Sequence, residues 1–113
     1  MKIKMVSLSN NEEFKSIIKG KRINNKYFTI FFKKLINKNN KFLNISFVAK
    51  RKLGNAVKRN KIKRRLRHIM HDAINKISLN LNYSYLIIAK STVLKDEYNS
   101  VKKTMFSNFE GIK

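Results

Sequence analysis

The chemically distinctive feature of this sequence is positive charge without nearby acid, and it is concentrated between Lys50 and Arg67. Ten of these eighteen residues are Lys or Arg, and no Asp or Glu occurs between Glu13 and Asp72. Five of the chain's six arginines lie here: Arg51, Arg59, Arg64, Arg65 and Arg67. Because a guanidinium presents several N–H donors in one plane, clustered arginines suit phosphate and base contacts. The stretch therefore predicts a surface that binds a polyanion.

The sequence contains few of the residue types that catalyse reactions through their side chains. The chain has six acidic residues, two histidines and no cysteine, and no carboxylate cluster suggests two-metal hydrolysis. His68 and His71 stand three apart without a third ligand, which indicates surface positions on a helix rather than a zinc site. No phosphate-binding loop, nucleophile elbow or zinc-protease motif occurs. We therefore predict a nucleic-acid-binding protein with no catalytic residue and no metal ligand of its own.

Length and composition predict a single domain over residues 1–113, with enough apolar residues (42%) for a core. The net charge of +21 favours nucleic acid as partner over an anionic membrane surface. No apolar run approaches the length of a membrane span. Residues 1–8 have no apolar signal-peptide core and indicate a basic tail. Together with the absence of cysteine, which suits a reducing compartment, this predicts a cytoplasmic protein with neither a membrane nor a small-molecule partner.

The elements that position these residues are expected in the order α-β-β-α-β-α, an α+β fold with a small, mainly antiparallel sheet and a long central basic helix. Ser9 and Glu12 have capping-box spacing and predict a short helix over 10–19, with Phe14, Ile17 and Ile18 on one side. Residues 21–25 indicate a turn or short edge strand. Two strands over 27–35 and 42–50, separated by a polar turn at 37–40, predict a hairpin.

The long helix is expected to begin after Asn55 as N-cap and to continue for about six turns. One apolar stripe runs along it at helical spacing: Ile62, Leu66, Ile69, Ala73 and Ile77. A basic amphipathic helix could also bind a membrane or calmodulin. Because strands precede and follow this basic helix in the sequence, its apolar stripe is expected to face the core. Its basic residues are then left to bind nucleic acid. A nearly continuous apolar strand over 83–90, typical of a central strand, and a last helix starting at 96–97 complete the fold.

A second candidate site follows from the alternation of the strands. Phe31, Val48 and Lys50 fall on the faces opposite the core-facing residues, and Arg59 projects near the edge of the sheet. An exposed aromatic ring beside lysines would form a groove for single-stranded nucleic acid. The alternative is that Phe31 is buried under a terminal helix, and the sequence leaves both possibilities open.

The stretch from Gly54 to Arg67 closely resembles the signature of the bacterial ribonuclease P protein component. It carries G-N-A-V, then R-N, then K-R-x-x-R at the family's offsets, and the resemblance extends over most of the chain. Three positions depart from the family pattern: Lys61 stands where Arg is usual, Lys50 where Ser is common, and Ile18 where an aromatic is frequent.

The resemblance implies a subunit of an endoribonuclease that matures the 5′ end of tRNA, in which the RNA subunit performs catalysis with Mg²⁺ held mainly by RNA. The implied partners are ribonuclease P RNA and the single-stranded 5′ leader of precursor tRNA. The implied RNA contacts are Arg51, Lys52, Arg59, Asn60, Lys61, Lys63, Arg64, Arg65 and Arg67. A leader cleft would be lined by Phe14, Phe31, Val48, Lys50 and Lys90, with Arg51 and Lys52 at its border. The family's fold further implies a left-handed strand-helix-strand crossover. The alternative function is a non-catalytic, ribosome-associated RNA-binding protein.

Overall fold

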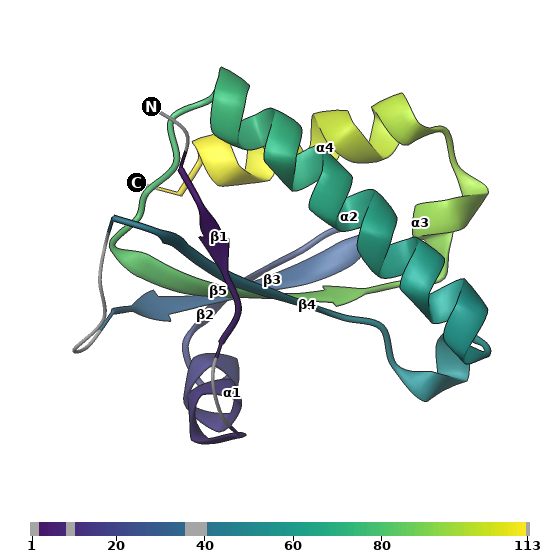
Figure 1. The fold of residues 1–113 in the computed structure, drawn as a ribbon, viewed down its shortest axis with the longest axis horizontal. Coiled ribbons are helices and arrows are strands. Elements are labelled where there is room, and N and C mark those ends of the chain that lie inside the picture. Colours follow the sequence, from purple (N-terminus) through teal and green to yellow (C-terminus); the bar gives the residue numbers. More distant parts are fainter. Residues whose placement is uncertain (1–2, 9–10, 36–40, 113) are drawn as a thin grey trace.

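A five-stranded sheet with helices on both faces forms the molecule (Figure 1). The computed structural model describes residues 3–8, 11–35 and 41–112. The strands are β1 (Met5–Val6), β2 (Lys21–Asn24), β3 (Phe28–Lys34), β4 (Leu43–Val48) and β5 (Tyr83–Ala89). The helices are α1 (Asn11–Ile18), the 3-10 turn η1 (Arg51–Leu53), α2 (Ala56–Lys76), α3 (Thr92–Lys95) and α4 (Tyr98–Glu110). Helices α2 and α4 cover one face of the sheet, and α1 lies against the other.

The strand order is β1-β4-β5-β3-β2, so the predicted hairpin of β3 and β4 is wrong. Strand β5 lies between them, antiparallel to β3 and parallel to β4. The sheet is therefore mixed rather than mainly antiparallel. The prediction of β5 as a central strand is confirmed. Because a strand that is apolar on both faces is best buried in the middle of the sheet, β5 lies between β3 and β4 and prevents them from pairing as a hairpin. The polar turn predicted at 37–40 lies outside the described residues.

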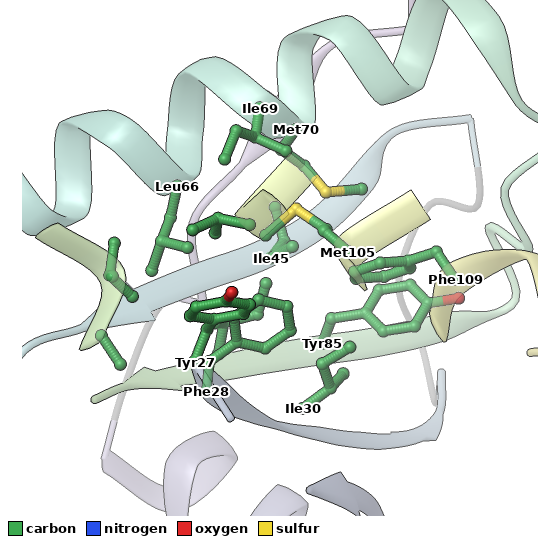
Figure 2. Close-up of a cluster of buried hydrophobic side chains, with 14 of the residues drawn as sticks. Tyr27, Phe28, Ile30, Ile45, Leu66, Ile69, Met70, Tyr85, Met105 and Phe109 are labelled. Carbon is green, nitrogen blue, oxygen red and sulfur yellow. The ribbon is translucent and has the colours of Figure 1, made fainter. Parts of the chain in front are cut away.

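The main core fills the space between the sheet and helices α2 and α4 (Figure 2). Leu66, Ile69 and Met70 point from α2 toward the sheet, and Met105 and Phe109 reach in from α4. The Tyr85 ring meets that of Phe109 at 5.1 Å between centroids, in an edge-to-face arrangement. The predicted stripe of α2 is thus confirmed as the core-facing side. This burial directs the helix's charged residues outward.

A smaller core lies on the opposite face, under α1. It consists of Leu8, Ile17, Phe31 and Leu86, with Phe14, Val48 and Ile88 partly buried against it. Ile18 was expected beside Ile17 but is 49% exposed, because the short helix turns it away from the sheet. The predicted capping residue Ser9 lies outside the described residues.

The N-terminus of α2 is defined by a glycine with positive φ followed by an N-cap residue. Gly54 follows η1 with φ of 142°, a conformation that side chains beyond glycine rarely adopt. The Asn55 side chain then accepts a hydrogen bond from the Lys58 N–H at 2.9 Å, which confirms the predicted N-cap. These contacts determine where the basic helix begins and therefore where its charges lie.

The N-terminal segment and the region before the last helix both differ from the predicted elements. Residues 1–8 were predicted to form a tail, but Met5–Val6 forms strand β1 beside β4, and the buried Leu8 N–H donates to Ser46 Oγ at 2.9 Å. The predicted last helix is present as α4. A further short helix, α3, precedes it and was not anticipated.

Candidate nucleic-acid interface

One flank of α2 carries a row of cations along the β4 side of the molecule. Arg59, Lys63 and Arg67 are spaced four residues apart and therefore share this row. The Arg67 guanidinium lies over the Phe47 ring of β4, 5.7 Å from its centroid. We call these three residues the β4 flank.

The charge on α2 opposes the helix's own stability. Like charges four residues apart repel, and cations in the first turn, where Lys58 and Arg59 lie, oppose the positive end of the helix dipole. No acidic residue occupies this first turn. A bound polyanion would relieve this repulsion.

The nearest acids are paired elsewhere. Asp72 lies 3.2 Å from the Lys102 ammonium of α4, and this contact lowers the pKa of the Asp72 carboxyl. Asp96 pairs with the Lys26 ammonium at 2.8 Å and accepts from the Tyr27 hydroxyl at 2.7 Å, and both contacts lower the pKa of the Asp96 carboxyl. These carboxylates join the elements of the fold and leave the charge of α2 available.

Arg59 carries an unsatisfied donor. Its side chain is half-buried, and among the described residues its Nε is the buried side-chain polar atom without a hydrogen-bond partner. A buried N–H that lacks an acceptor is costly. An acceptor from a bound partner, such as a phosphate oxygen, would remove that cost.

Arg65 differs from its neighbours because it bonds within the protein. Its Nη1 donates to the carbonyl oxygens of Val93 at 2.8 Å and Asp96 at 3.1 Å, at the end of α3. The guanidinium also lies 6.0 Å from the Tyr98 ring centroid. Arg65 therefore anchors α3 and α4 to α2, and its RNA contact remains a prediction. The remaining predicted RNA contacts on this part of the chain are exposed: Arg51, Lys52, Asn60, Lys61 and Arg64.

On the other face of the sheet, α1 leaves part of the surface uncovered. Strand register places Val48 beside Ile88, Ile88 beside Thr29, and Thr29 beside Asn24. We call this row, which crosses four strands, the outer strip. Val48 and Ile88 are only partly buried, so this half of the strip keeps apolar surface accessible to a ligand. In the other half, the Thr29 hydroxyl donates to Asn24 Oδ1 at 2.8 Å.

A pocket of about 300 Å³ adjoins the outer strip at the end of the central strands. Thr29 and Ile88 contribute to it, together with Lys50, Lys52 and Lys90. The Lys90 ammonium donates to Asn24 Oδ1 at 2.8 Å and to the carbonyl of Asn25. The predicted cleft residues Val48, Lys50 and Lys90 are therefore brought together at one edge.

The two predicted cleft aromatics lie deeper. Phe31 is only 9% exposed, packed with Ile17 and Leu86, so the alternative of burial under a helix is correct and an exposed ring at this position is not found. Phe14 on α1 is half-buried and keeps part of its surface accessible. Sequence reasoning missed Ile88, Thr29 and Asn24, because a continuously apolar strand does not reveal which of its residues a short helix leaves uncovered.

His68 and His71 are exposed, and within residues 3–8, 11–35 and 41–112 no three His, Cys, Asp or Glu residues gather as metal ligands. No helix in the same part of the chain is both long and apolar enough to cross a membrane.

Comparison with known proteins adds an independent observation. The family model for ribonuclease P matches residues 3–113. The ribonuclease P protein component of Mycoplasma mycoides is 34% identical over 114 residues, covering 100% of both chains. That of Streptococcus pneumoniae is 37% identical over 95 residues, 83% of this chain and 73% of the relative. The solved ribonuclease P protein of Thermotoga maritima superposes with a TM-score of 0.78 at 25% identity, covering 96% of this chain and 98% of that one.

Proposed function

Because the chain belongs to the bacterial ribonuclease P protein component family, we propose that it holds the single-stranded 5′ leader of precursor tRNA on the outer strip while α2 contacts ribonuclease P RNA. As a protein component of ribonuclease P, it is part of an endoribonuclease that processes the 5′ ends of tRNA, and its partner is ribonuclease P RNA.

The observation that carries the leader proposal is the partly exposed apolar pair Val48 and Ile88 of the outer strip, with lysines beside it. Unpaired bases bind proteins by lying against apolar or aromatic side chains while cations hold the phosphates. Val48 and Ile88 offer the first kind of contact, and Lys50 and Lys90 the second. A duplex would bring phosphates but no accessible base faces, so the strip suits a single strand.

Lys90 supports this assignment through its orientation. Its two contacts, to Asn24 and Asn25, use two of the three N–H donors of an ammonium and leave one for a further acceptor. A positioned cation loses less conformational entropy on binding a phosphate than a free lysine does. The accessible side of Phe14 extends the surface toward α1.

The β4 flank supports the contact with the RNA subunit. Arg59 has a half-buried donor in need of an acceptor, and Lys63 and Arg67 continue the row. Each neutralised phosphate releases counterions, so affinity should fall steeply with salt. Basic residues also reduce the repulsion between two RNAs, which Mg²⁺ would otherwise screen.

In this arrangement Mg²⁺ is held by the RNA and not by the protein. The described residues contain no acid or histidine cluster that fits it, and Asp72 and Asp96 are committed to lysine and tyrosine partners. The protein's own contribution is then charge and position, exerted in the bacterial cytoplasm where precursor tRNA is found.

The test compares precursor tRNA with and without a leader, using protein reconstituted with a bacterial ribonuclease P RNA. Ile88→Ala should weaken binding of the leader-bearing precursor about fivefold, the loss expected for one apolar contact, and should leave leaderless tRNA unaffected. Ile74→Ala is the matched control, since Ile74 is also half-buried but packs against the main core. Equal affinity of the wild-type enzyme for both tRNAs would refute the leader proposal.

A further inference from the structure

A second pocket lies on the helix-covered side of the sheet, between α2 and the α3–α4 segment. Its volume is about 300 Å³, and it shares no lining residue with the pocket beside the outer strip. The lining residues are Lys61, Arg64, Arg65, His68, Leu94 and Tyr98. We call it the α2–α4 pocket; neither the leader proposal nor the β4 flank uses it.

The pocket has an apolar floor and a basic rim. Leu94 and Tyr98 are half-buried and form the floor, whereas Lys61, Arg64 and His68 are exposed at the rim. This combination places a flat hydrophobic surface within reach of several phosphate-binding groups.

The floor is held in place by the surrounding structure. Arg65 fixes the end of α3 through its bonds to Val93 and Asp96 and lies over the Tyr98 ring. The Tyr98 hydroxyl donates to Asp72 Oδ2 at 3.4 Å, a long contact that still orients the ring. A preorganised ring costs less to bind than a mobile one.

We propose that the α2–α4 pocket takes one unpaired nucleotide of ribonuclease P RNA. The base lies against Tyr98 and Leu94, and its phosphate contacts Arg64 and Lys61. The volume is at the lower end of the range of ligand pockets, roughly 300–1,000 Å³, which suits one base rather than a larger group. Aromatic and apolar contact beneath a rim of cations is the recognition mode of unstacked bases.

The RNA subunit, rather than the leader, is the occupant because of where the pocket lies. Helices α2, α3 and α4 are on one side of the sheet, and α1 is on the other (Figure 1). The outer strip lies on the α1 side, because its residues Val48 and Ile88 pack against the cluster under α1. A short leader on the strip does not reach around the sheet, whereas a large folded RNA bound to α2 extends past both of its flanks. The inference rests on family membership and does not depend on the leader proposal.

The first test places an acid in the pocket and uses a neighbouring acid as control. Leu94→Glu changes the net charge by one, and Lys95→Glu, on the exposed adjacent residue, changes it by two. Affinity for ribonuclease P RNA is measured without tRNA, so the leader plays no part. We expect a loss of about tenfold for Leu94→Glu and a smaller loss for Lys95→Glu. An equal or greater loss for Lys95→Glu would mean that overall charge controls binding, and the pocket proposal would be wrong.

The second test isolates the ring. Tyr98→Leu should weaken RNA binding about tenfold with an unchanged salt dependence, because no phosphate contact is lost. Tyr98→Phe keeps the ring and loses only the hydroxyl contact with Asp72, so it should weaken binding less than Tyr98→Leu does. Phe106→Leu, which removes a half-buried aromatic elsewhere on α4, should bind like the wild type. Comparing the variants at temperatures where circular dichroism shows each to be folded separates binding from stability. Wild-type affinity for Tyr98→Leu, or equal losses for the Leu and Phe variants, would overturn the assignment.

Discussion

Replacing Arg65 by Met should lower the stability of the fold, although Arg65 lies within the most basic stretch of the sequence. Its Nη1 donates to the carbonyls of Val93 and Asp96, at 2.8 and 3.1 Å, where the four-residue α3 ends. These carbonyls have no continuing helix to satisfy them, so the guanidinium acts as a C-terminal cap. Met keeps the apolar stem of Arg65 and removes only the charged head.

The magnitude follows from these contacts. A hydrogen bond to a charged group contributes about 1.5–3 kcal/mol, and the two bonds share one nitrogen and are counted as one. The contact with Tyr98, 6.0 Å from the ring centroid, adds about 0.5 kcal/mol at a partly exposed site. Arg65→Met should therefore cost about 2–3.5 kcal/mol of unfolding free energy. For a domain of this size, this lowers Tm by about 8–14 °C.

Arg64→Met is the matched control, because the same substitution is made one residue earlier at an exposed position. It should change stability by less than about 0.5 kcal/mol but reduce the salt dependence of RNA binding by about one phosphate contact. Thermal unfolding followed by circular dichroism, and RNA binding over a range of salt concentrations, measure the two effects. Equal Tm values for the two variants would refute the assignment of Arg65 to anchoring.

Three further predictions concern other parts of the molecule. Gly54→Ala should cost about 1–3 kcal/mol, because φ is 142° and a Cβ would lie 2.7 Å from Lys58 Cδ, whereas Gly111→Ala, at φ of −77°, should be nearly neutral in urea unfolding. Burial raises the pKa of Tyr85 above its usual value of 10.0, so its contribution to stability is complete below pH 10 and is lost as the pH rises further, when the unfolded chain ionises first. Between about pH 8 and 11.5 the free energy of unfolding should fall less steeply with pH for Tyr85→Phe than for the wild type. Identical slopes for the two proteins would contradict this reasoning. Arg59→Ala should raise the Mg²⁺ concentration needed for precursor cleavage more than Lys76→Ala does; equal shifts would indicate that bulk charge alone matters.

Local patterns determined much of this structure in advance. The Asn55 cap and the apolar stripe from Ile62 to Ala73 predicted α2 and its buried side correctly, because both depend on residues within a few turns of one another. Clustered arginine and the absence of acid identified the basic surface, since net charge is a property of composition. The resemblance of the segment starting at Gly54 to a family signature agrees with the family match over residues 3–113.

Only the tertiary structure decided which strands are neighbours and which surfaces remain open. The position of β5 between β3 and β4 depends on long-range pairing, for which the sequence offered an equally plausible hairpin. The burial of Phe31 and the exposure of Ile18 depend on the angle at which α1 meets the sheet. Arg65 and Arg64 are the same residue type at adjacent positions, yet only Arg65 reaches the carbonyls of α3. Composition alone thus predicted a polyanionic partner, whereas the folded chain separates cations that bond within the protein, as Arg65 does, from those that stay exposed.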